Sequence, residues 1–443
     1  MVVNNAQQQL ITYLKTPKAI RERCNRLFKL AYTDSLPYFY CDLSQLDKVA
    51  NYVIEVIREQ YPDLNIPFHS RWRHFEVGKI LRLTELEHKL SGLTPLEIAQ
   101  TKFDLVIVSV LLDAGAGANW QYQESETGLV FRRSEGLAIA SFRMFCQGTF
   151  SSDPAYPLQV DAQALKKLTL EQLAQGFQVS QGNQLLGLEG RLLLLQRLGL
   201  SISRLPKMFG ESHPRPGNLV NYLLDLSTSP PSSVPLSTSG VADWGIQVTE
   251  KRQKPSPVKS KLSASRVLTA VLEGLGNIWP GRLAIANVNL GDVWLHPALK
   301  VEDDSDHYVP FHKLSQWLTY SLLEPLQELG MEITELEQLT GLPEYRNGGL
   351  CLDLGLLKLK DTSILKEPQL PGSVAIVEWR ALTVSLLDSI AVVIRQQLKM
   401  NSQELPLVKI LQGGTWTAGR KLANQLRVGG SPPLQIKSDG TVF

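Results

Sequence analysis

The chain has 443 residues, enough to bury a sizeable core in one large domain or in two or three smaller ones. Its 45 basic and 43 acidic residues nearly cancel, so the chain as a whole exerts little attraction on polyanions. No stretch approaches the roughly 20 apolar residues of a membrane span, and the four widely spaced cysteines form no CxxC pair, which favours reduced thiols. We therefore expect a cytoplasmic protein that binds neither nucleic acid nor membranes.

Helical periodicity of apolar residues begins near the N-terminus. Residues 44–61 are predicted to form a helix with Ser44 as its N-cap. The run FDLVIVSVLL at 103–112 fits either a buried strand or a buried helix, and its helical surroundings favour a helix. Thr169 and Gln172 have the spacing of a capping box, which predicts a helix start there.

Glycine and proline set the expected ends of the next helices. The run LEGRLLLLQRLG at 188–199 is predicted to stop at Gly199, since glycine commonly follows the end of a helix. Residues 314–329 are apolar at helical spacing, and Pro325 is expected to kink or restart that helix because it lacks an N–H group.

The last third of the chain contains two more predicted helices. Thr334 and Glu337 have capping-box spacing and predict a short helix that ends at Gly341. Residues 379–398 place leucine, isoleucine and valine on one helical face, which predicts an amphipathic helix.

Strand patterns are few, so the predicted fold class is mainly α with a small β element. The best candidates are AIANVNL at 284–290 and the tail PLQIKSDGTVF at 433–443. Residues 227–263 are rich in serine and proline and resemble a flexible insertion. We expect this insertion to separate two helical parts of a catalytic domain, 1–226 and 264–443.

The segment PFHSRWRHF at 67–75 is the densest cluster of polar and aromatic residues. Its candidate functional residues are His69, Arg71, Arg73 and His74. Arginine binds phosphate or carboxylate through forked hydrogen bonds, and histidine transfers protons near neutral pH. The alternative is a structural cluster in which the arginines pair with nearby acids such as Glu76.

The segment DAGAGANW at 113–120 follows the apolar run 103–112. Its glycines would let the backbone approach a ligand, and Asp113 could bind hydroxyl groups or position a base. It lacks the lysine of a phosphate-binding loop and the spacing of a dinucleotide motif. A plain helix-ending turn explains it equally well.

The loop LPEYRNGGL at 342–350 combines an acid, a tyrosine and an arginine. Glu344 could stabilise positive charge on a sugar or act as a base, with Tyr345 and Arg346 orienting the substrate. The alternative is a surface Glu–Arg pair. Downstream, Glu378 and Arg380 fall at a predicted helix start, where the glutamate could serve only as a cap.

A metal site is conceivable from the histidines and acids. His69, His74, His296, His312 and Asp113 supply suitable ligand types. The spacing of five between His69 and His74 does not align two ligands on one helical face. We therefore expect neither a metal nor another cofactor.

Ten motifs together resemble one known family. They are IPFHSRWRHFE, LLDAGAGANW, RSEG, FSSDP, LEGR, PFHKLSQWLTYSL, LTGLPEYRNGGL, EWRALT, GGTW and SDGTVF. This set is similar to the Urc/Urg family of fungal and bacterial proteins, a domain of unknown function associated with uracil catabolism. The resemblance runs to Phe443 and excludes only the extreme N-terminus and the Ser/Pro-rich insertion.

A second resemblance concerns the chemistry. In order and spacing, five runs of the chain look like the queuosine-phosphate salvage hydrolases, which are helical, DNA-glycosylase-like enzymes that cleave an N-glycosidic bond. Their catalytic aspartate corresponds to Glu344, followed by matching Tyr345 and Arg346, and their base-contacting histidine falls near His74. Their aspartate-rich C-terminal segment meets GGTWTAGR, where Trp416 alone matches, so recognition of the leaving group is expected to differ.

The resemblance implies an N-glycosidase that hydrolyses a ribosyl or phosphoribosyl ureido compound. Glu344 would lie beneath the sugar, His74 would protonate the leaving group, and Arg71, Arg73, Lys313 or Arg346 would hold a phosphate. The remaining candidate substrate-binding residues are His69, Asp113, Trp120, His312, Tyr345, Glu378, Arg380 and Trp416. Two alternatives stay open: a noncatalytic ligand-binding or scaffold protein, and a metal-dependent amidohydrolase.

Overall fold

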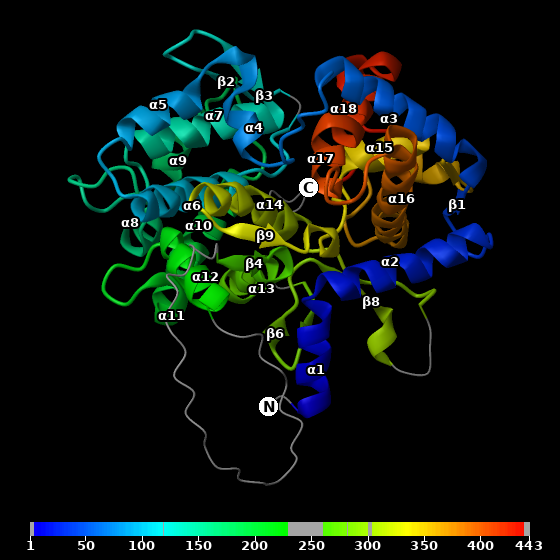
Figure 1. The fold of residues 1–443 in the computed structure, drawn as a ribbon, viewed down its shortest axis with the longest axis horizontal. Helices are drawn as coiled ribbons and strands as arrows, with labels where there is room; N and C mark the ends of the chain where they lie inside the picture. The colour runs from blue at the N-terminus through cyan, green and yellow to red at the C-terminus, as the bar shows by residue number, and fades with distance from the viewer. Residues whose placement is uncertain (1–3, 118, 229–259, 281, 300–303, 438–443) are drawn as a thin grey trace, which may run out of the picture.

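The computed structural model describes residues 4–117, 119–228, 260–280, 282–299 and 304–437. These residues form a mainly helical structure, as predicted, in which short strands pair in twos (Figure 1). Buried apolar side chains from the whole length of the chain form one large continuous cluster. No helix in the described ranges has both the length and the apolar character that crossing a bilayer requires.

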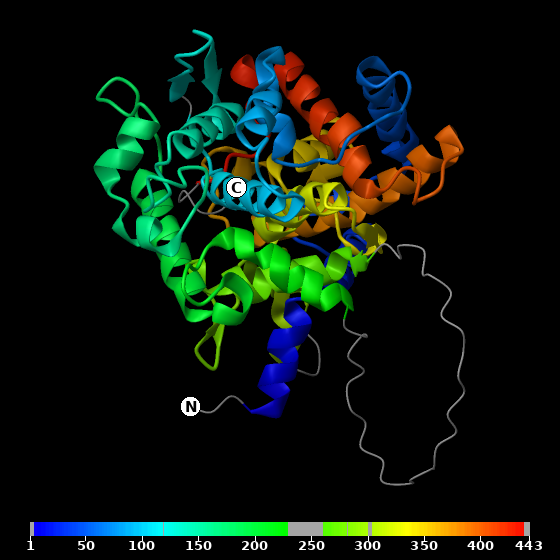
Figure 2. The same cartoon turned by 60° about the vertical axis from the view of Figure 1, so that its left-hand side comes forward.

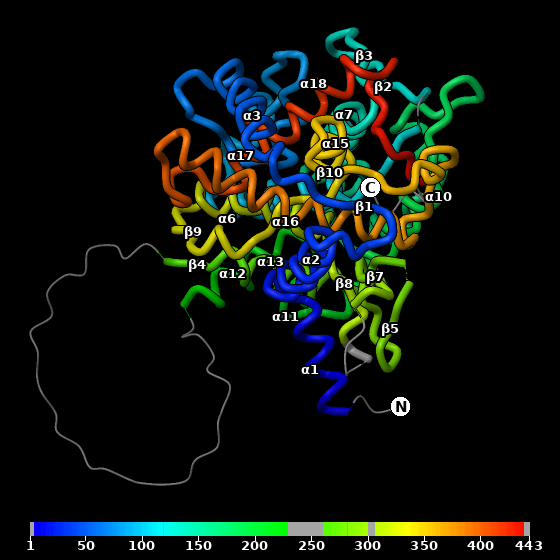
Figure 3. The backbone as a smooth tube through the Cα atoms, turned by 90° about the vertical axis from the view of Figure 1, so that its right-hand side faces the viewer, coloured from blue at the N-terminus to red at the C-terminus, as the bar shows by residue number. Residues whose placement is uncertain are grey.

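Helices from the two ends of the chain pack together. This group comprises α1 (Asn5–Leu14), α2 (Pro17–Tyr32), α3 (Leu46–Gln60), α15 (Tyr345–Asp353), α16 (Val374–Leu398), α17 (Leu407–Ile410) and α18 (Trp416–Leu426). The long buried helix α16 runs between α2 on one side and α3 on the other (Figure 3). The first helix, α1, projects away from the body of the molecule (Figure 2).

The middle of the chain forms the other group of helices. It comprises α4 (Trp72–Phe75), α5 (Arg82–Lys89), α6 (Pro95–Leu111), α7 (Arg133–Cys146), α8 (Ala162–Lys167), α9 (Leu170–Gly176), α10 (Leu188–Arg204), α11 (Pro206–Phe209), α12 (Leu219–Thr228), α13 (Ala264–Leu275) and α14 (Lys313–Glu328). The ambiguous apolar run at 103–112 falls in α6, so the helix prediction is confirmed. The capping box of Thr169 and Gln172 is also confirmed, at the start of α9.

In the described ranges, five two-stranded sheets lie among these helices. Four are antiparallel, namely β1 (Phe39–Cys41) with β10 (Leu357–Leu359), β2 (Gln121–Gln123) with β3 (Val130–Arg132), β5 (Ala284–Ile285) with β6 (Val288–Asn289), and β7 (Val293–Leu295) with β8 (Tyr308–Pro310). The parallel pair is β4 (Lys261–Ser263) with β9 (Glu332–Thr334). The strand prediction at 284–290 is confirmed as a hairpin whose turn residues, Ala286 and Asn287, both have positive φ.

The predicted strand at 433–443 is confirmed at one position only. Ile436 forms an isolated bridge with Gln369, and residues 438–443 lie outside the described part of the chain. Most of the predicted insertion, 229–259, also lies outside it. Of its edges, residues 227–228 end α12 and 261–263 form β4. The division into 1–226 and 264–443 stays a prediction.

Two predicted helix boundaries are wrong for local reasons. Ser44 is not the cap of α3, because the Asp42 side chain accepts from Ser44 N (3.2 Å) and starts a 3-10 turn that precedes the helix. Gly199 does not end its helix, since α10 continues to Arg204. A Cβ at Gly199 would lie 2.9 Å from the Ala162 carbonyl oxygen, so this glycine permits close packing against α8.

The short helix predicted after Thr334 is wrong as well. Thr334 ends β9, and only the 3-10 turn Leu336–Gln338 follows. Glu335, between them, has a left-handed φ of 57°, which is incompatible with a continuous helix from Thr334. The helix predicted at 379–398 begins earlier, at Val374, so Glu378 and Arg380 lie inside α16 rather than at its start.

Pro325 neither ends nor restarts α14. The helix continues to Glu328, and the missing N–H of Pro325 leaves the Ser321 carbonyl without its usual partner in the helix. The indole N–H of Trp72 donates to that oxygen at 2.7 Å. The proline thus creates an acceptor that links α14 to the segment 67–75.

Candidate functional site

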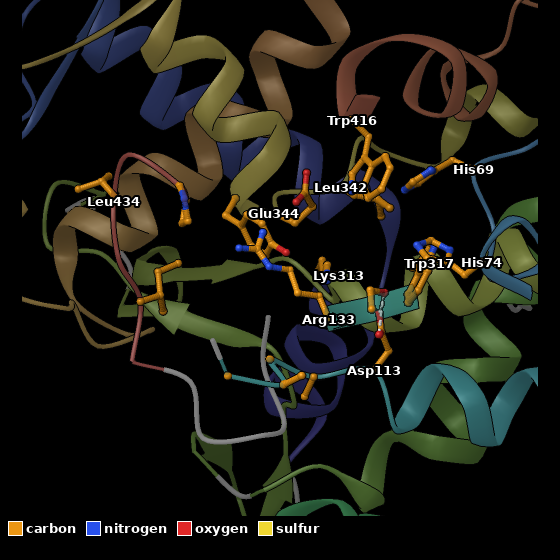
Figure 4. A pocket seen from close by; sticks show the side chains of 18 residues that line it. His69, His74, Asp113, Arg133, Lys313, Trp317, Leu342, Glu344, Trp416 and Leu434 are labelled. Carbon is orange, nitrogen blue, oxygen red and sulfur yellow. Dashed lines mark hydrogen bonds between the residues drawn. The ribbon is translucent and has the colours of Figure 1, made fainter. Parts of the chain in front are cut away.

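A pocket of about 240 Å³ lies where residues from the first, middle and last parts of the chain meet (Figure 4). The segment 67–75 and the loop 342–350 both reach its wall. The pocket is lined by His69, His74, Asp113, Ala114, Gly115, Ala116, Gly117, Arg133, Ser134, Lys313, Trp317, Leu342, Glu344, Tyr345, Trp416, Pro432, Leu434 and Ile436. Its size suits a small metabolite.

Helices α7, α14 and α15 have their N-termini at this pocket. The first residues of α7, α14 and α15 are Arg133, Lys313 and Tyr345, and all three line the wall. Each helix N-terminus carries a partial positive charge from the aligned peptide dipoles. The carboxylates of Glu344 and Asp292 already occupy the starts of α15 and α14, so the uncapped start of α7 is the one that favours an added anionic group.

Glu344 is the N-cap of α15 and is only 7% exposed. Its two carboxylate oxygens accept from the backbone N–H groups of Arg346 (2.7 Å) and Asn347 (2.6 Å). Burial raises the pKa of Glu344 above its usual value, while these two hydrogen bonds and the Lys313 charge act in the opposite direction. The carboxyl group is fixed in position by its own helix.

The Arg346 guanidinium donates to the Gly430 carbonyl at 2.7 Å and lies over the Tyr345 ring. It does not line the pocket, so the structure does not place it where a phosphate cradle needs it. The loop is also buried rather than forming a surface Glu–Arg pair. Of the three residues singled out in this loop, Glu344 and Tyr345 reach the pocket.

Lys313 is half-buried, and none of the carboxylates that the structure describes lies within salt-bridge distance of its Nζ atom. Nζ lies 5.9 Å from the centre of the Trp317 ring. Burial lowers the pKa of Lys313, and the charges of Glu344 and Asp113 oppose this shift. The ammonium group is thereby made more acidic than an ordinary lysine.

The start of α14 is built by residues behind the pocket. Asp292 accepts from the Lys313 backbone N–H at 3.0 Å, and Arg380 binds Asp292 through two hydrogen bonds of 2.8 and 2.7 Å. His312 has a left-handed φ of 47°, and its Nε2 lies 2.9 Å from the Leu14 carbonyl oxygen. The structure thus places Arg380 and His312 behind Lys313, in positions that orient it, rather than on the pocket wall.

Glu378 also lies away from the pocket. Its carboxylate accepts from the Tyr38 backbone N–H at 3.2 Å and lies 3.2 Å from Nε2 of fully buried His296. The contact joins α16 to the N-terminal part of the chain. The expectation that Glu378 is a helix cap is wrong, because Ser373 caps α16.

Arg71 supports the pocket from behind. It is fully buried, donates to Ser109 Oγ at 2.8 Å, and forms an ion pair with Asp113 at 3.1 Å. Asp113 also accepts from Ser134 Oγ, at 2.7 and 2.8 Å. Asp113 therefore reaches the pocket with its carboxylate already held, and Arg71 is committed to holding it.

Two other predicted residues lie outside the pocket wall. Arg73 forms an ion pair with Glu324 at 2.9 Å on α14. Trp120 is fully buried, and its indole N–H donates to the Phe177 carbonyl at 3.0 Å. The structural alternative considered for segment 67–75 therefore applies to its arginines, although Glu76 is not their partner.

The two histidines of that segment do face the pocket. Burial lowers the pKa of His69 to about 3, and burial together with the Arg71 charge lowers the pKa of His74 to about 4. Both rings are thus neutral at physiological pH. Among the described residues, no group of three or more histidine, cysteine, aspartate or glutamate side chains is arranged to hold a metal ion.

Comparison with known proteins gives a clear relationship. The family model described as "Protein of unknown function (DUF1688)" matches residues 13–443. The chain belongs to this family. It is 40% identical to Protein urg3 of Schizosaccharomyces pombe over 443 residues, covering 98% of this chain and 99% of that protein. It is 36% identical to Uracil catabolism protein 4 of Lachancea kluyveri, again over 98% and 99% of the two chains.

The pocket of this DUF1688 protein contains residues that sequence patterns did not single out. Arg133 and Ser134 belong to the motif RSEG, which by itself looks like an ordinary polar helix start. Trp317 falls at apolar helical spacing and looks like a core residue. Pro432, Leu434 and Ile436 come from the tail, and no local signal showed that this segment folds against the pocket.

Proposed function

We propose that this DUF1688 protein acts in uracil catabolism as an N-glycosidase that hydrolyses a small phosphoribosyl ureido compound. The pathway is inferred from the printed name of the relative from Lachancea kluyveri. The observation that carries the reaction is Glu344, a buried carboxyl group held on the pocket wall by two backbone N–H groups. Cleavage of an N-glycosidic bond develops positive charge on the sugar, and a fixed carboxylate stabilises that charge.

The leaving nitrogen also needs a proton. His74 was the first candidate, but a pKa of about 4 leaves it neutral at physiological pH, so it cannot supply that proton as an imidazolium ion. We assign the proton to the Lys313 ammonium, whose acidity burial increases and which lies among Glu344, Asp113 and Trp317. Water then adds its hydroxyl to the sugar carbon, and its remaining proton restores the lysine.

Arg133 is the cation best placed to hold a phosphate. It replaces Arg71, Arg73 and Arg346, because Arg133 lines the pocket and those three arginines do not. Arg133 opens α7, whose N-terminus has no side-chain cap, and donates to the Gly429 carbonyl at 2.5 Å. An uncapped helix N-terminus beside a guanidinium suits a phosphate oxygen, because its N–H groups are available as donors.

The test is to incubate the purified protein with N-(5-phosphoribosyl)urea and to measure released urea and ribose 5-phosphate. We expect turnover by the wild type and a loss of about two orders of magnitude or more in kcat for Glu344→Gln, with binding largely kept. Glu324→Gln is the matched control, because that glutamate is partly buried outside the pocket. It should retain turnover.

The alternative functions give different results in the same assay. A noncatalytic binding protein would bind the compound as wild type and as Glu344→Gln, and neither would release urea. A metal-dependent amidohydrolase would release ammonia from the ureido group and would lose activity after treatment with a chelator. Either outcome would overturn the N-glycosidase proposal.

A further inference from the structure

Four rings gather at one end of the pocket: His69, His74, Trp317 and Trp416, here called the ring cluster (Figure 4). Their centres are 5.5 to 6.4 Å apart in the four histidine–tryptophan contacts. In the same view Leu434 lies at the opposite end, with Glu344, Lys313 and Arg133 between. The ring cluster is thus one end of an elongated site.

The hydrogen bonding of His69 is fixed by Gln412. The amide oxygen Oε1 of Gln412 lies 2.9 Å from His69 Nδ1, so Nδ1 carries the proton and donates. In the neutral ring the other nitrogen, Nε2, then carries a lone pair, and within the described part of the chain Nδ1 is the ring atom with a hydrogen bond. His69 is only 3% exposed and lines the pocket, so this acceptor is available to a bound molecule and to little else.

The helix that carries Gln412 is built for this contact. Residues Leu411–Thr415 form a π-helical turn between α17 and α18. Gly414 lets this turn approach α3, since a Cβ there would lie 2.5 Å from Val53 Cγ1. A π-helical turn shifts the direction of the following side chains, and this one places Gln412 and Trp416 on the same side as His69.

Two other members of the ring cluster carry unused hydrogen-bonding atoms. His74 Nδ1 and Trp317 Nε1 are enclosed without a hydrogen bond of normal geometry, and the Ser70 carbonyl acts only weakly on the His74 ring. Both residues are at least nine-tenths buried. Since a buried polar atom without a partner costs free energy, such atoms beside a pocket indicate that a ligand supplies part of their environment.

We propose that the ring cluster binds the leaving group and selects an uncharged, planar group that carries N–H beside C=O, that is, a ureido or amide group. His69 Nε2 accepts from the N–H. The His74 ring makes no hydrogen bond of normal geometry to a residue that the structure describes, and we assign it the donation to the carbonyl oxygen. The indole rings of Trp317 and Trp416 provide flat walls for a planar group. This inference rests on the proposed function, since it assigns one end of the same site.

The same geometry disfavours two other kinds of leaving group, a cationic amine and a group without N–H. A cationic amine would meet Lys313 and Arg71, whose charges lie 5.9 and 5.5 Å from the centre of the Trp317 ring. A group without N–H would leave His69 Nε2 unpaired, and a site built around a hydrogen bond rejects a ligand that cannot make it.

The experiment compares two probes by calorimetry: N-(5-phosphoribosyl)urea and ribose 5-phosphate, which lacks the ureido group. We expect the first to bind about tenfold tighter to the wild type, since two hydrogen bonds of about 0.7 kcal/mol each amount to that ratio. His69→Phe should lower the ratio to about threefold, because it removes one of the two hydrogen bonds, and Gln412→Leu should also lower it. Both variants should leave the affinity for ribose 5-phosphate unchanged. Exposed His88→Phe is the control and should keep the wild-type ratio.

The outcomes separate this inference from the proposed function. Discrimination that depends on His69, without any release of urea, would support the ring cluster and overturn the N-glycosidase. Release of urea with a ratio unchanged in both variants would overturn the ring cluster and leave the N-glycosidase standing. Gln412→Leu keeps the test informative if His69→Phe does not fold. A form of the parent compound with methyl groups in place of all three ureido N–H hydrogens that binds as tightly as the parent would also overturn the acceptor role of His69.

Discussion

Two regions of this protein bury several charged groups, and they do so differently. Around Glu124, Arg82 and Arg143 donate to the carboxylate at 2.5 to 2.8 Å, and Thr127 adds another hydrogen bond. Burial alone would raise the pKa of Glu124, but these hydrogen bonds outweigh it and bring the pKa to about 2. In the pocket, burial dominates, raising the pKa of Glu344 and lowering that of Lys313.

This difference in pKa shifts separates charged groups that stabilise the fold from charged groups that are available to a ligand. The Glu124 cluster satisfies its charges within the protein, so it has little left to offer a ligand. As far as the structure describes the chain, the pocket keeps a lysine without an ion pair, two neutral histidines and ring nitrogens without hydrogen-bond partners. Such an arrangement costs stability and is typical of a site that awaits a substrate. Substitutions in the two regions should therefore have opposite consequences.

Glu124→Gln should have the largest effect. The amide can accept only through one oxygen, which leaves Arg82 or Arg143 without a charged partner in a buried site. We expect a loss of about 3 to 5 kcal/mol in the free energy of unfolding, measured by urea denaturation. Turnover by the folded fraction should remain. A stability equal to the wild type would remove the distinction between the two regions.

Lys313→Met should reduce kcat by about two orders of magnitude or more, because it removes the proton donor. The free energy of unfolding should stay the same or rise, since the lowered pKa means that burial disfavours the ammonium ion. In the wild type, activity should fall as pH rises through the lowered lysine pKa and as pH falls through the raised pKa of Glu344. A variant that keeps the alkaline limb would rule out Lys313 as the acid.

Arg133→Met should raise KM about tenfold and change kcat much less, because a phosphate contact away from the reacting bond stabilises substrate and transition state alike. Steady-state kinetics with N-(5-phosphoribosyl)urea measures this split. Arg132→Met, at the exposed neighbouring position, is the control. Equal KM values for both variants would place the phosphate elsewhere.

His74→Asn should have the smallest effect on the free energy of unfolding. The effect should appear only in acid and be absent at neutral pH. In the wild type, the lowered pKa values of His69 and His74 mean that the unfolded chain binds more protons below pH 6.5. Their contribution is therefore lost as pH falls from about 6.5 toward 4. Replacing His74 should flatten this part of the curve of unfolding free energy against pH. An unchanged slope would show that His74 titrates normally.

The sequence was informative where the signal is local. Helical periodicity located α3 and most of α16, the helical surroundings of the run 103–112 favoured the helix found in α6, and the capping box at Thr169 marks the true start of α9. The helix predicted after Thr334 does not form, because Glu335 adopts a left-handed conformation that separates Thr334 from the following turn. No local sequence pattern indicated this conformation. Gly199 misled because its role is a contact with α8 rather than a helix end.

For the site, the sequence predicted which segments reach the pocket better than it predicted the role of each residue in them. The His/Arg-rich stretch and the acidic loop do reach one pocket, through His69, His74, Glu344 and Tyr345. The arginines were misassigned because their partners are remote in the chain, such as Ser109 for Arg71 and Glu324 for Arg73. Arg133 and Trp317 were missed because a polar helix start and an apolar helical position look ordinary without their neighbours in space.

Pro325 makes possible a hydrogen bond that helps to position one end of this pocket. The Ser321 carbonyl, which Pro325 leaves without a helical partner, accepts a hydrogen bond from the Trp72 indole N–H. Trp72 lies two residues before His74, and Ser321 lies one helical turn after Trp317. Together with the hydrogen bond from Arg71 N to Ser321 Oγ (2.9 Å) and the Arg73–Glu324 ion pair, the indole hydrogen bond holds the segment that carries His74 against the helix that carries Trp317. An N–H group at position 325 would compete with the Trp72 indole for that oxygen. A residue usually regarded as a helix breaker therefore helps to hold two members of the ring cluster, His74 and Trp317, next to each other.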